Sequence, residues 1–150
     1  MSDRAKGEEL GAALMAEMAA QAGPGMKLPP PIFTEIGARI TAYEPGKSIT
    51  VHMDVQERYQ NPASVMQGGM VVTLMDCALG PLAYLVAPPS STSQLNTTYL
   101  RPIGPDLPYV TCTATYLGKA GRSMQLMAEV HDPDGRVLAR SLATHIIMGR

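Results

Sequence analysis

The sequence has almost no net charge, because 12 lysines and arginines stand against 13 aspartates and glutamates. It contains neither a block of like charge nor the positive excess that draws a polyanion in from a distance. We therefore expect no nucleic-acid partner. The N-terminal residues also lack the uninterrupted apolar stretch of a secretory signal, so we expect the protein in the cytoplasm.

Cysteine and histidine are scarce and unclustered. Cys77 and Cys112 belong to no CxxC or Cys/His spacing, which argues against a disulfide or a zinc site and fits free thiols in a reducing compartment. The histidines His52, His131 and His145 have no metal-ligand spacing either, and we expect each to be solvated or packed. We expect no metal and no cofactor.

The composition is that of a globular protein: 45% of the 150 residues are hydrophobic and 17% are charged. This length suits one domain with a substantial core. Apolar side chains at a helical spacing predict a helix over residues 8–22, which stops at Gly23-Pro24-Gly25. We divide the chain into an N-terminal helix with a Pro-rich connector (residues 1–31) and a main domain (residues 32–150).

Alternating apolar and polar residues predict strands over most of the main domain. A first hairpin covers residues 36–42 and 49–55 and turns at Glu44-Pro45-Gly46. Tight turns rich in Gly, Pro and Asp separate the later strands. These are residues 91–101, 109–117, 123–131 and 136–148, with turns at 118–121 and 132–135. The pattern predicts an antiparallel sheet of about six strands.

Residues 70–87 are apolar on nearly every side, as in a core helix or a membrane span. Asp76 near the middle would cost about 2.5–3.5 kcal/mol on insertion into a bilayer, and Gly80-Pro81 interrupts the stretch. We therefore predict a core helix and no membrane partner. The expected fold is α+β, a sheet wrapped around one central hydrophobic helix, with an extra N-terminal helix.

Asp76 is the first candidate for chemistry, because an ionised carboxylate among apolar side chains is costly and such costs gather at functional sites. The alternative is that Asp76 emerges at the helix surface. Gly68 and Gly69, at the start of the same helix, offer backbone N–H groups without intrahelical partners. A helix start of this kind suits a developing oxyanion.

Gly68 and Asp76 are eight residues apart, which is about 12 Å along a helix. They cannot both contact one carbonyl from a single chain. If both serve one substrate, they come from different subunits, and the geometry predicts a homodimer or a dimer of dimers with shared active sites.

The segment from Asn61 to Gly80, NPASVMQGGMVVTLMDCALG, resembles the hallmark of the PaaI-like hotdog thioesterases, in the 4-hydroxybenzoyl-CoA thioesterase superfamily. Those proteins show Asn, then HGG, then a helix with an acidic residue eight positions after the first glycine. The later segment SQLNTTYLRP resembles their strand after the helix. The resemblance implies a hotdog fold and hydrolysis of an acyl-coenzyme A thioester.

Carried over by position, the resemblance makes Asp76 the nucleophile or the general base. It implies that the Gly68 N–H polarises the thioester carbonyl, and that Asn61 orients the acyl group or water. Thr92 stands where some relatives have a helper hydroxyl, and Gln67 and Gly69 join the substrate site. Asn61 followed by Pro62 is also compatible with an ordinary turn.

Gln67 stands where the family usually has histidine, and glutamine hydrogen-bonds but does not titrate. This substitution favours one alternative, a catalytically weak acyl-CoA-binding or regulatory module on the same fold. A second alternative is a hotdog dehydratase or hydratase, which needs a histidine paired with a carboxylate.

Coenzyme A is polyanionic, and three cations fall at a strand end or a turn where they could contact its phosphates: Arg101, Lys119 and Arg122. Cys77 adjoins Asp76, but neighbours on a helix point about 100° apart and no histidine is near in sequence. We assign Cys77 to core packing.

Overall fold

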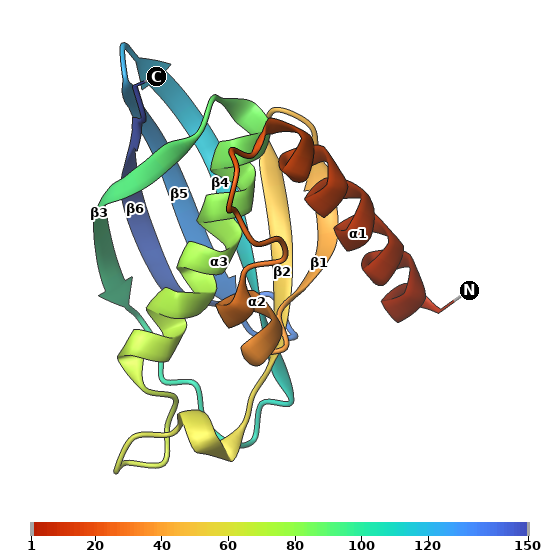
Figure 1. The fold of residues 1–150 in the computed structure, drawn as a ribbon. Helices are drawn as coiled ribbons and strands as arrows, with labels where there is room; N and C mark the ends of the chain where they lie inside the picture. The colour runs from red at the N-terminus through yellow and green to blue at the C-terminus, as the bar shows by residue number, and fades with distance from the viewer. Residues whose placement is uncertain (1, 150) are drawn as a thin grey trace.

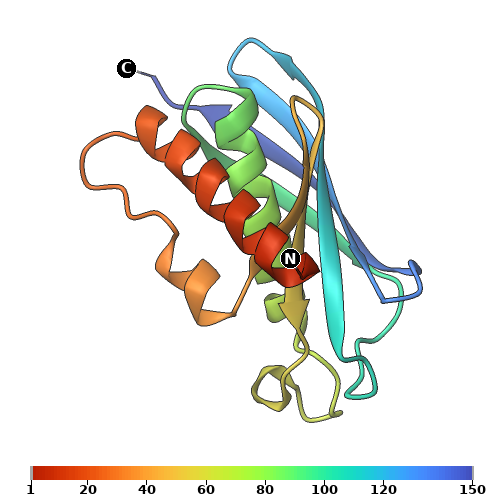
Figure 2. The ribbon, with the colours of Figure 1, turned by 90° about the vertical axis from the view of Figure 1, so that its right-hand side faces the viewer.

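The computed structural model describes residues 2–149 and contains one antiparallel sheet with the helices α1, α2 and α3 gathered on one of its faces (Figures 1 and 2). The strand order is β1-β2-β4-β5-β6-β3. The strands are β1 (Arg39–Glu44), β2 (Ser48–Asp54), β3 (Ser90–Tyr99), β4 (Tyr109–Ala120), β5 (Ser123–His131) and β6 (Val137–Ile147). The predicted α+β hotdog fold is confirmed.

Helix α3 (Gly68–Val86) is the central helix that the sequence predicts. One side of it is fully buried against the sheet, including Leu74, Ala78 and Leu82. It is long and apolar enough to cross a membrane, but half of its apolar stretch is buried inside the fold, as in the core helix of a folded domain. Pro81 lies within the helix without ending it.

Helix α1 (Asp3–Gln21) packs against β1 and α3. It begins five residues earlier than predicted because the Ser2 hydroxyl caps it, accepting a hydrogen bond from the Ala5 N–H at 3.3 Å. Leu14 and Met18 bury the apolar side of the helix, as their spacing predicts. The chain then runs back along α3 through the connector, residues 22–30 (Figure 1).

The structure contains two short elements that the sequence pattern does not predict. Helix α2 (Pro31–Glu35) follows the connector, and a 3-10 turn, η1 (Glu57–Tyr59), follows β2. Each is too short to leave a helical repeat in the sequence. The first strand was predicted to begin at residue 36, but Gly37, with φ of +64°, reverses the chain there and β1 begins at Arg39.

The sheet faces alternate as expected of strands with one buried side. Ile49, Val51 and Met53 of β2 are fully buried, while the residues between them face outward. The turn predicted at residues 118–121 is wrong in extent, because β4 continues to Ala120. Its register shifts between Tyr116 and Gly118, which is a β-bulge, so Gly118 belongs to the strand.

Candidate active site

Asp76 lies halfway along α3 on the side that faces away from the sheet centre, and its side chain reaches a cavity of about 630 Å³. In the single chain this residue is exposed. The prediction that Asp76 is a buried charge is therefore wrong, because the helix is apolar in composition but only partly covered. What singles Asp76 out is its place in the cavity.

A chain of hydrogen bonds connects Asp76 to two strands. The Thr92 hydroxyl, on β3, donates to Asp76 Oδ1 at 3.1 Å. The same hydroxyl oxygen lies 3.3 Å from His145 Nε2, on β6, and Ser90 Oγ lies 3.4 Å from His145 Nδ1. The structure thus brings together Asp76 and Thr92, which the resemblance paired, and adds a histidine and a serine.

His145 is the site residue that sequence reasoning missed. It is only 2% exposed, and burial lowers the pKa of its imidazole, against the opposing effect of the Asp76 carboxylate. A neutral ring donates from one nitrogen and accepts at the other. The alternation of β6 could have indicated its burial, because His145 lies on the same inward-facing side of the strand as the buried Ser141 and Ala143.

Cys77 does not compete with Asp76 for the role of nucleophile. Burial, with the Asp76 carboxylate adding to it, raises the pKa of the Cys77 thiol to about 11. The thiol therefore stays protonated at neutral pH, and a protonated thiol is a poor nucleophile. Both cysteines are free and buried.

Gly68 begins α3 and lies against Tyr99, whose hydroxyl donates to the Gly68 carbonyl oxygen at 2.9 Å. A Cβ at this position would come within 3.0 Å of the Tyr99 hydroxyl oxygen, so a side chain could not enter without displacing the tyrosine. The N–H groups of Gly68 and Gly69 lie in the first turn and have no acceptor within the helix. The exposed Gln67 precedes them and its side chain forms no cap.

Asn61 shapes the loop before α3. Its side-chain oxygen accepts hydrogen bonds from the N–H groups of Ala63 at 2.9 Å and Val65 at 3.4 Å, which is the turn that the sequence left open as an alternative. This leaves the Asn61 amide nitrogen as the atom available to a substrate. The assigned role of Asn61 stays a prediction.

Asn61 and Gly68 do not share the cavity of Asp76. They line a second cavity of about 370 Å³, together with Arg101 and Tyr99. Five of the predicted site residues therefore line two different cavities in one chain: Asp76 and Thr92 line the first, and Asn61, Gly68 and Arg101 line the second. The other four line neither cavity: Gln67, Gly69, Lys119 and Arg122.

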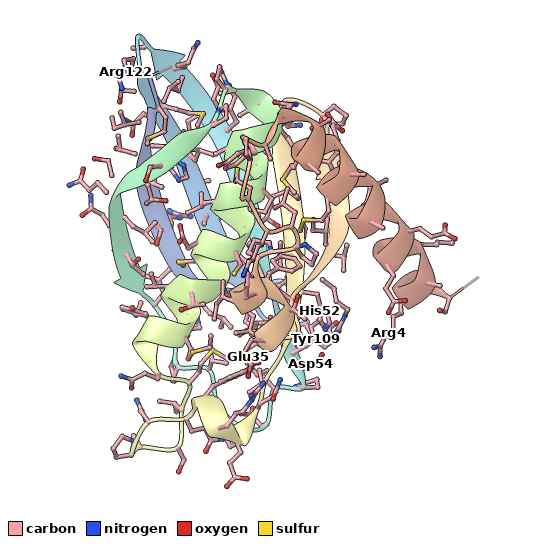
Figure 3. The ribbon with its side chains drawn as sticks, in the orientation of Figure 1. Arg4, Glu35, His52, Asp54, Tyr109 and Arg122 are labelled. Carbon is pink, nitrogen blue, oxygen red and sulfur yellow. The ribbon has the colours of Figure 1, made fainter. Side chains whose placement is uncertain are left out.

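The three candidate phosphate ligands are not close together in one chain. Arg101 donates to the Val137 carbonyl at 2.8 Å, beside the second cavity. Lys119, near the end of β4, and Arg122, in the β4–β5 turn, are both exposed, and Arg122 donates to the Ile147 carbonyl at 3.0 Å. Figure 3 shows Arg122 at the end of the sheet opposite to His52 and Tyr109.

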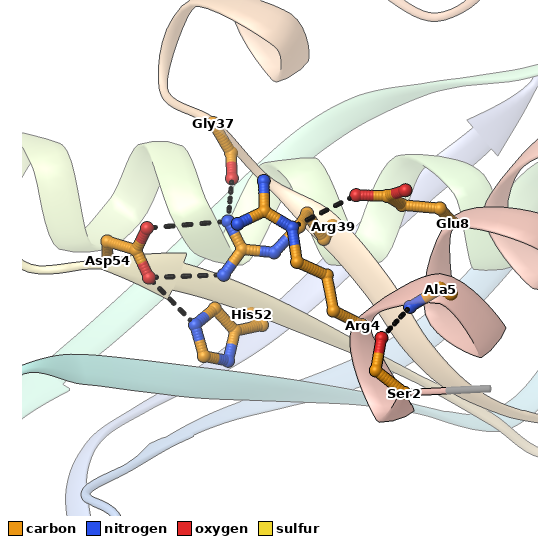
Figure 4. Close-up of polar contacts among 8 residues, drawn as sticks. All are labelled: Ser2, Arg4, Ala5, Glu8, Gly37, Arg39, His52 and Asp54. Carbon is orange, nitrogen blue, oxygen red and sulfur yellow. Dashed lines mark hydrogen bonds and ion pairs between the residues drawn. The ribbon is translucent and has the colours of Figure 1, made fainter.

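His52 belongs to a separate polar cluster on the other face of the sheet. Its ring stacks on Tyr109 with centroids 4.5 Å apart, and Nε2 lies 2.9 Å from Asp54 Oδ1. Arg39 also donates to Asp54 (Figure 4). These contacts lower the pKa of the Asp54 carboxyl, chiefly through the hydrogen bond from Arg39. The cluster ties β1 to β2 and β4 and takes no part in the cavity.

Comparisons with known proteins agree with this architecture. A family model described as the thioesterase superfamily matches residues 63–139, which is half of the chain and contains Gly68, Asp76 and Thr92. No curated protein matches the sequence.

Several solved structures share the fold. The PaaI protein from the phenylacetic acid degradation operon of E. coli superposes with a TM-score of 0.76 at 18% identity, covering 90% of this chain and 96% of that one. A thioesterase from Haemophilus influenzae gives a TM-score of 0.72 at 20% identity, covering 78% and 82%. The PaaI protein of Thermus thermophilus, as an Asn-to-Asp mutant, gives 0.72 at 20% identity, covering 79% and 100%. The chain belongs to the thioesterase superfamily and has the hotdog fold of the PaaI proteins.

Proposed function

We propose that this protein hydrolyses an acyl-coenzyme A thioester to the free acid and coenzyme A, with Asp76 as the catalytic carboxylate. The observation that carries the proposal is the position of Asp76 in the large cavity, where the Thr92 hydroxyl donates to its Oδ1. That hydrogen bond holds the carboxylate in place within the cavity. Because Oδ1 is engaged, we assign Oδ2 to the chemistry.

Two routes use the same carboxylate. As a general base, Asp76 takes a proton from water while the hydroxide adds to the thioester carbon. The tetrahedral oxyanion then collapses, the carbon–sulfur bond breaks, and the departing thiolate takes the proton back from Asp76. As a nucleophile, Asp76 adds to the carbon itself, expels the thiolate and forms an anhydride, which water hydrolyses.

The oxyanion of either route needs a hydrogen-bond donor, and we assign this role to the N–H of Gly68 of the partner subunit. In one chain, Gly68 and Asp76 are separated by about 12 Å of helix and line different cavities. A homodimer, alone or paired into a tetramer, would let the two groups meet across the interface. The edge strand β3 supports this proposal. It has ten residues, and the backbone N–H and C=O groups on its open side can pair with a strand of another subunit.

The remaining predicted site residues are assigned to the two ends of the substrate. Asn61, Gln67 and Gly69 would hold the thioester end from the partner side, while Arg101, Lys119 and Arg122 would contact phosphates. We also expect a cytoplasmic location, which the free buried thiols Cys77 and Cys112 support.

The test is the release of free thiol from a panel of acyl-CoAs by wild type and by Asp76→Asn. The asparagine keeps the shape but removes the charge, so kcat should fall by about 10²-fold or more. Asp134→Asn, on the exposed β5–β6 turn, is the matched control and should retain wild-type kcat. Full activity of Asp76→Asn would refute the assignment, and acyl-CoA binding without any hydrolysis by wild type would favour the binding module.

A single turnover in ¹⁸O-labelled water tests the nucleophilic route. A general base delivers labelled oxygen to the acid product and leaves Asp76 unlabelled. In the nucleophilic route, water that attacks the Asp76 carboxyl carbon of the anhydride releases an unlabelled acid and leaves the label in Asp76, whereas water that attacks the acyl carbon labels the acid. Label in Asp76 therefore identifies the nucleophilic route. Mass spectrometry of the product and of the peptide that contains Asp76 detects the label in each.

The hydratase alternative is favoured by one observation, the approach of His145 and Asp76 to the same hydroxyl of Thr92. Hydrolysis is better supported, because His145 is buried behind Thr92 and its lowered pKa keeps the ring neutral. Loss of the conjugated double bond of an enoyl-CoA without thiol release would reverse this ranking.

A further inference from the structure

The cavity at Asp76 continues well beyond the reacting group. Four of its lining residues lie along one stripe of α3, at Thr73, Asp76, Gly80 and Tyr84. Their spacing of three and four residues puts them on one face of the helix. From Asp76 to Tyr84 the stripe covers eight residues, or about 12 Å of helix.

The opposite wall comes from the N-terminal segment. Met26 and Leu28 of the connector and Ile32 and Phe33 of α2 line the cavity, and Met18 closes it from α1. The Tyr84 hydroxyl donates to the Met26 sulfur at 3.5 Å, so connector and helix touch at one end. Met26 and Ile32 remain 42% and 49% exposed, which is unusual for large apolar side chains bordering an otherwise apolar cavity.

The wall is apolar apart from a small polar group at the reacting end. The polar side chains there form the hydrogen-bond chain of the site, which consists of Asp76, Thr92, His145 and Ser90, with Thr73 close by. Lys27 also lines the cavity but is exposed, so its ammonium can stay in water while its stem covers apolar surface. A volume of about 630 Å³ falls within the roughly 300–1,000 Å³ of ordinary ligand pockets.

Length decides which apolar group fits. An extended peptide backbone spans about 3.6 Å with three bonds, which is about 1.2 Å of length per bond. We use the same length per bond for an extended acyl chain. The arm of about 12 Å from Asp76 to Tyr84 therefore accommodates about ten bonds.

We propose that this cavity binds the acyl group of the substrate and prefers a straight, uncharged acyl chain of about eight to ten carbons. The connector and Gly80 determine this preference for chain length. The inference rests on the proposed function, since it takes the thioester carbon to lie at Asp76. It assigns to the N-terminal segment, outside the matched family region of residues 63–139, the role of selecting the substrate.

Gly80 offers the sharpest test because it lies within the arm and a Cβ there would meet nothing within 4 Å. It is four residues from Asp76, or about 6 Å, so a larger side chain would block the chain after about five bonds. Because Pro81 follows and disfavours a helical residue with a Cβ before it, the urea midpoint and circular dichroism of Gly80→Leu are measured first to establish that it folds. Ala16→Leu, on the exposed side of α1, is the control that adds the same side chain elsewhere.

The measurement is kcat/KM for butyryl-, hexanoyl-, octanoyl-, decanoyl- and tetradecanoyl-CoA. For wild type, the value should rise by up to about fourfold per added methylene, the effect of burying one methylene, and stop rising at about ten carbons. Gly80→Leu should lower the octanoyl-to-butyryl ratio at least tenfold. Ile32→Ala should lower it about threefold, and Ala16→Leu should leave it unchanged.

Binding of 1-decanol, an uncharged chain of the same length, followed by calorimetry, separates this inference from the proposed function. Wild type should bind 1-decanol and Gly80→Leu should not. If no acyl-CoA is hydrolysed but this difference persists, the proposed function fails and the cavity assignment stands. If hydrolysis occurs with a flat chain-length profile, with a preference for aromatic acyl groups, or with a ratio that Gly80→Leu does not change, the acyl-chain assignment is overturned.

Discussion

Replacing Thr92 by valine tests the hydrogen bond on which the site depends. Valine has the shape of threonine without the hydroxyl, so Thr92→Val removes the donor to Asp76 Oδ1 and the contact with His145 Nε2. A hydrogen bond to a charged group contributes about 1.5–3 kcal/mol. If this bond fixes the carboxylate in the transition state, kcat/KM should fall about tenfold to a hundredfold.

The assay is thiol release from the best acyl-CoA of the panel, with urea unfolding measured in parallel. Thr92 is exposed on an edge strand, but its hydroxyl is the partner of the buried His145 Nε2, so the free energy of unfolding should fall by about 1–3 kcal/mol and leave the protein folded. Thr92→Ser keeps the hydroxyl and should stay within threefold of wild type.

A double-mutant cycle provides the refutation. In the Asp76→Asn background the charge is gone, so Thr92→Val should cost much less than in wild type. Equal losses in both backgrounds would show that Thr92 acts independently of Asp76. An unchanged kcat/KM for Thr92→Val would remove the hydroxyl from the mechanism.

Two further predictions concern His145 and the basic turn. Burial holds the pKa of the His145 imidazole below the ordinary 6.5. As the pH falls, the unfolded chain therefore protonates His145 before the folded protein does. The stability that the neutral ring provides is complete above pH of about 6.5 and is lost as the pH falls through the folded pKa. Urea midpoints should therefore drop more for wild type than for His145→Gln between about pH 7 and pH 5, and equal drops would contradict this. Arg122→Ala, and to a smaller extent Lys119→Ala, should raise KM for acyl-CoA at unchanged kcat, an effect that weakens at high salt. An equal rise for a pantetheine thioester, which lacks the nucleotide, would show that these residues do not contact it.

The fold could be predicted because its signals are local. Alternation identifies β2 and the later strands, and an apolar stretch interrupted by Asp76 identifies α3. The strand order could not be obtained in this way, because β2 pairs with β4 and β3 pairs with β6 over long sequence separations. The helix α2 was missed because five residues are too few to show a helical period.

From the sequence, candidate site residues could be grouped only where they share one segment. Asp76 and Gly68 lie on the same helix and came with the family motif. His145 lies 53 residues from Thr92, and only the pairing of β3 with β6 brings the two together. The second cavity around Asn61 and the N-terminal wall of the first depend equally on packing, which no local pattern encodes.

The sheet order has a consequence for how the chain folds. In the middle of the sheet, β2 pairs with β4, so that Asp54 lies opposite Tyr109 although α3 and β3 separate them in the sequence. Pairings this distant along the chain carry a large loop-closure cost and slow the folding of a domain. During synthesis α3 leaves the ribosome before the strands β4 and β5 that cover it. The nascent chain therefore exposes its most apolar helix until β4 and β5 have been synthesised, and exposed apolar surface of this kind promotes aggregation.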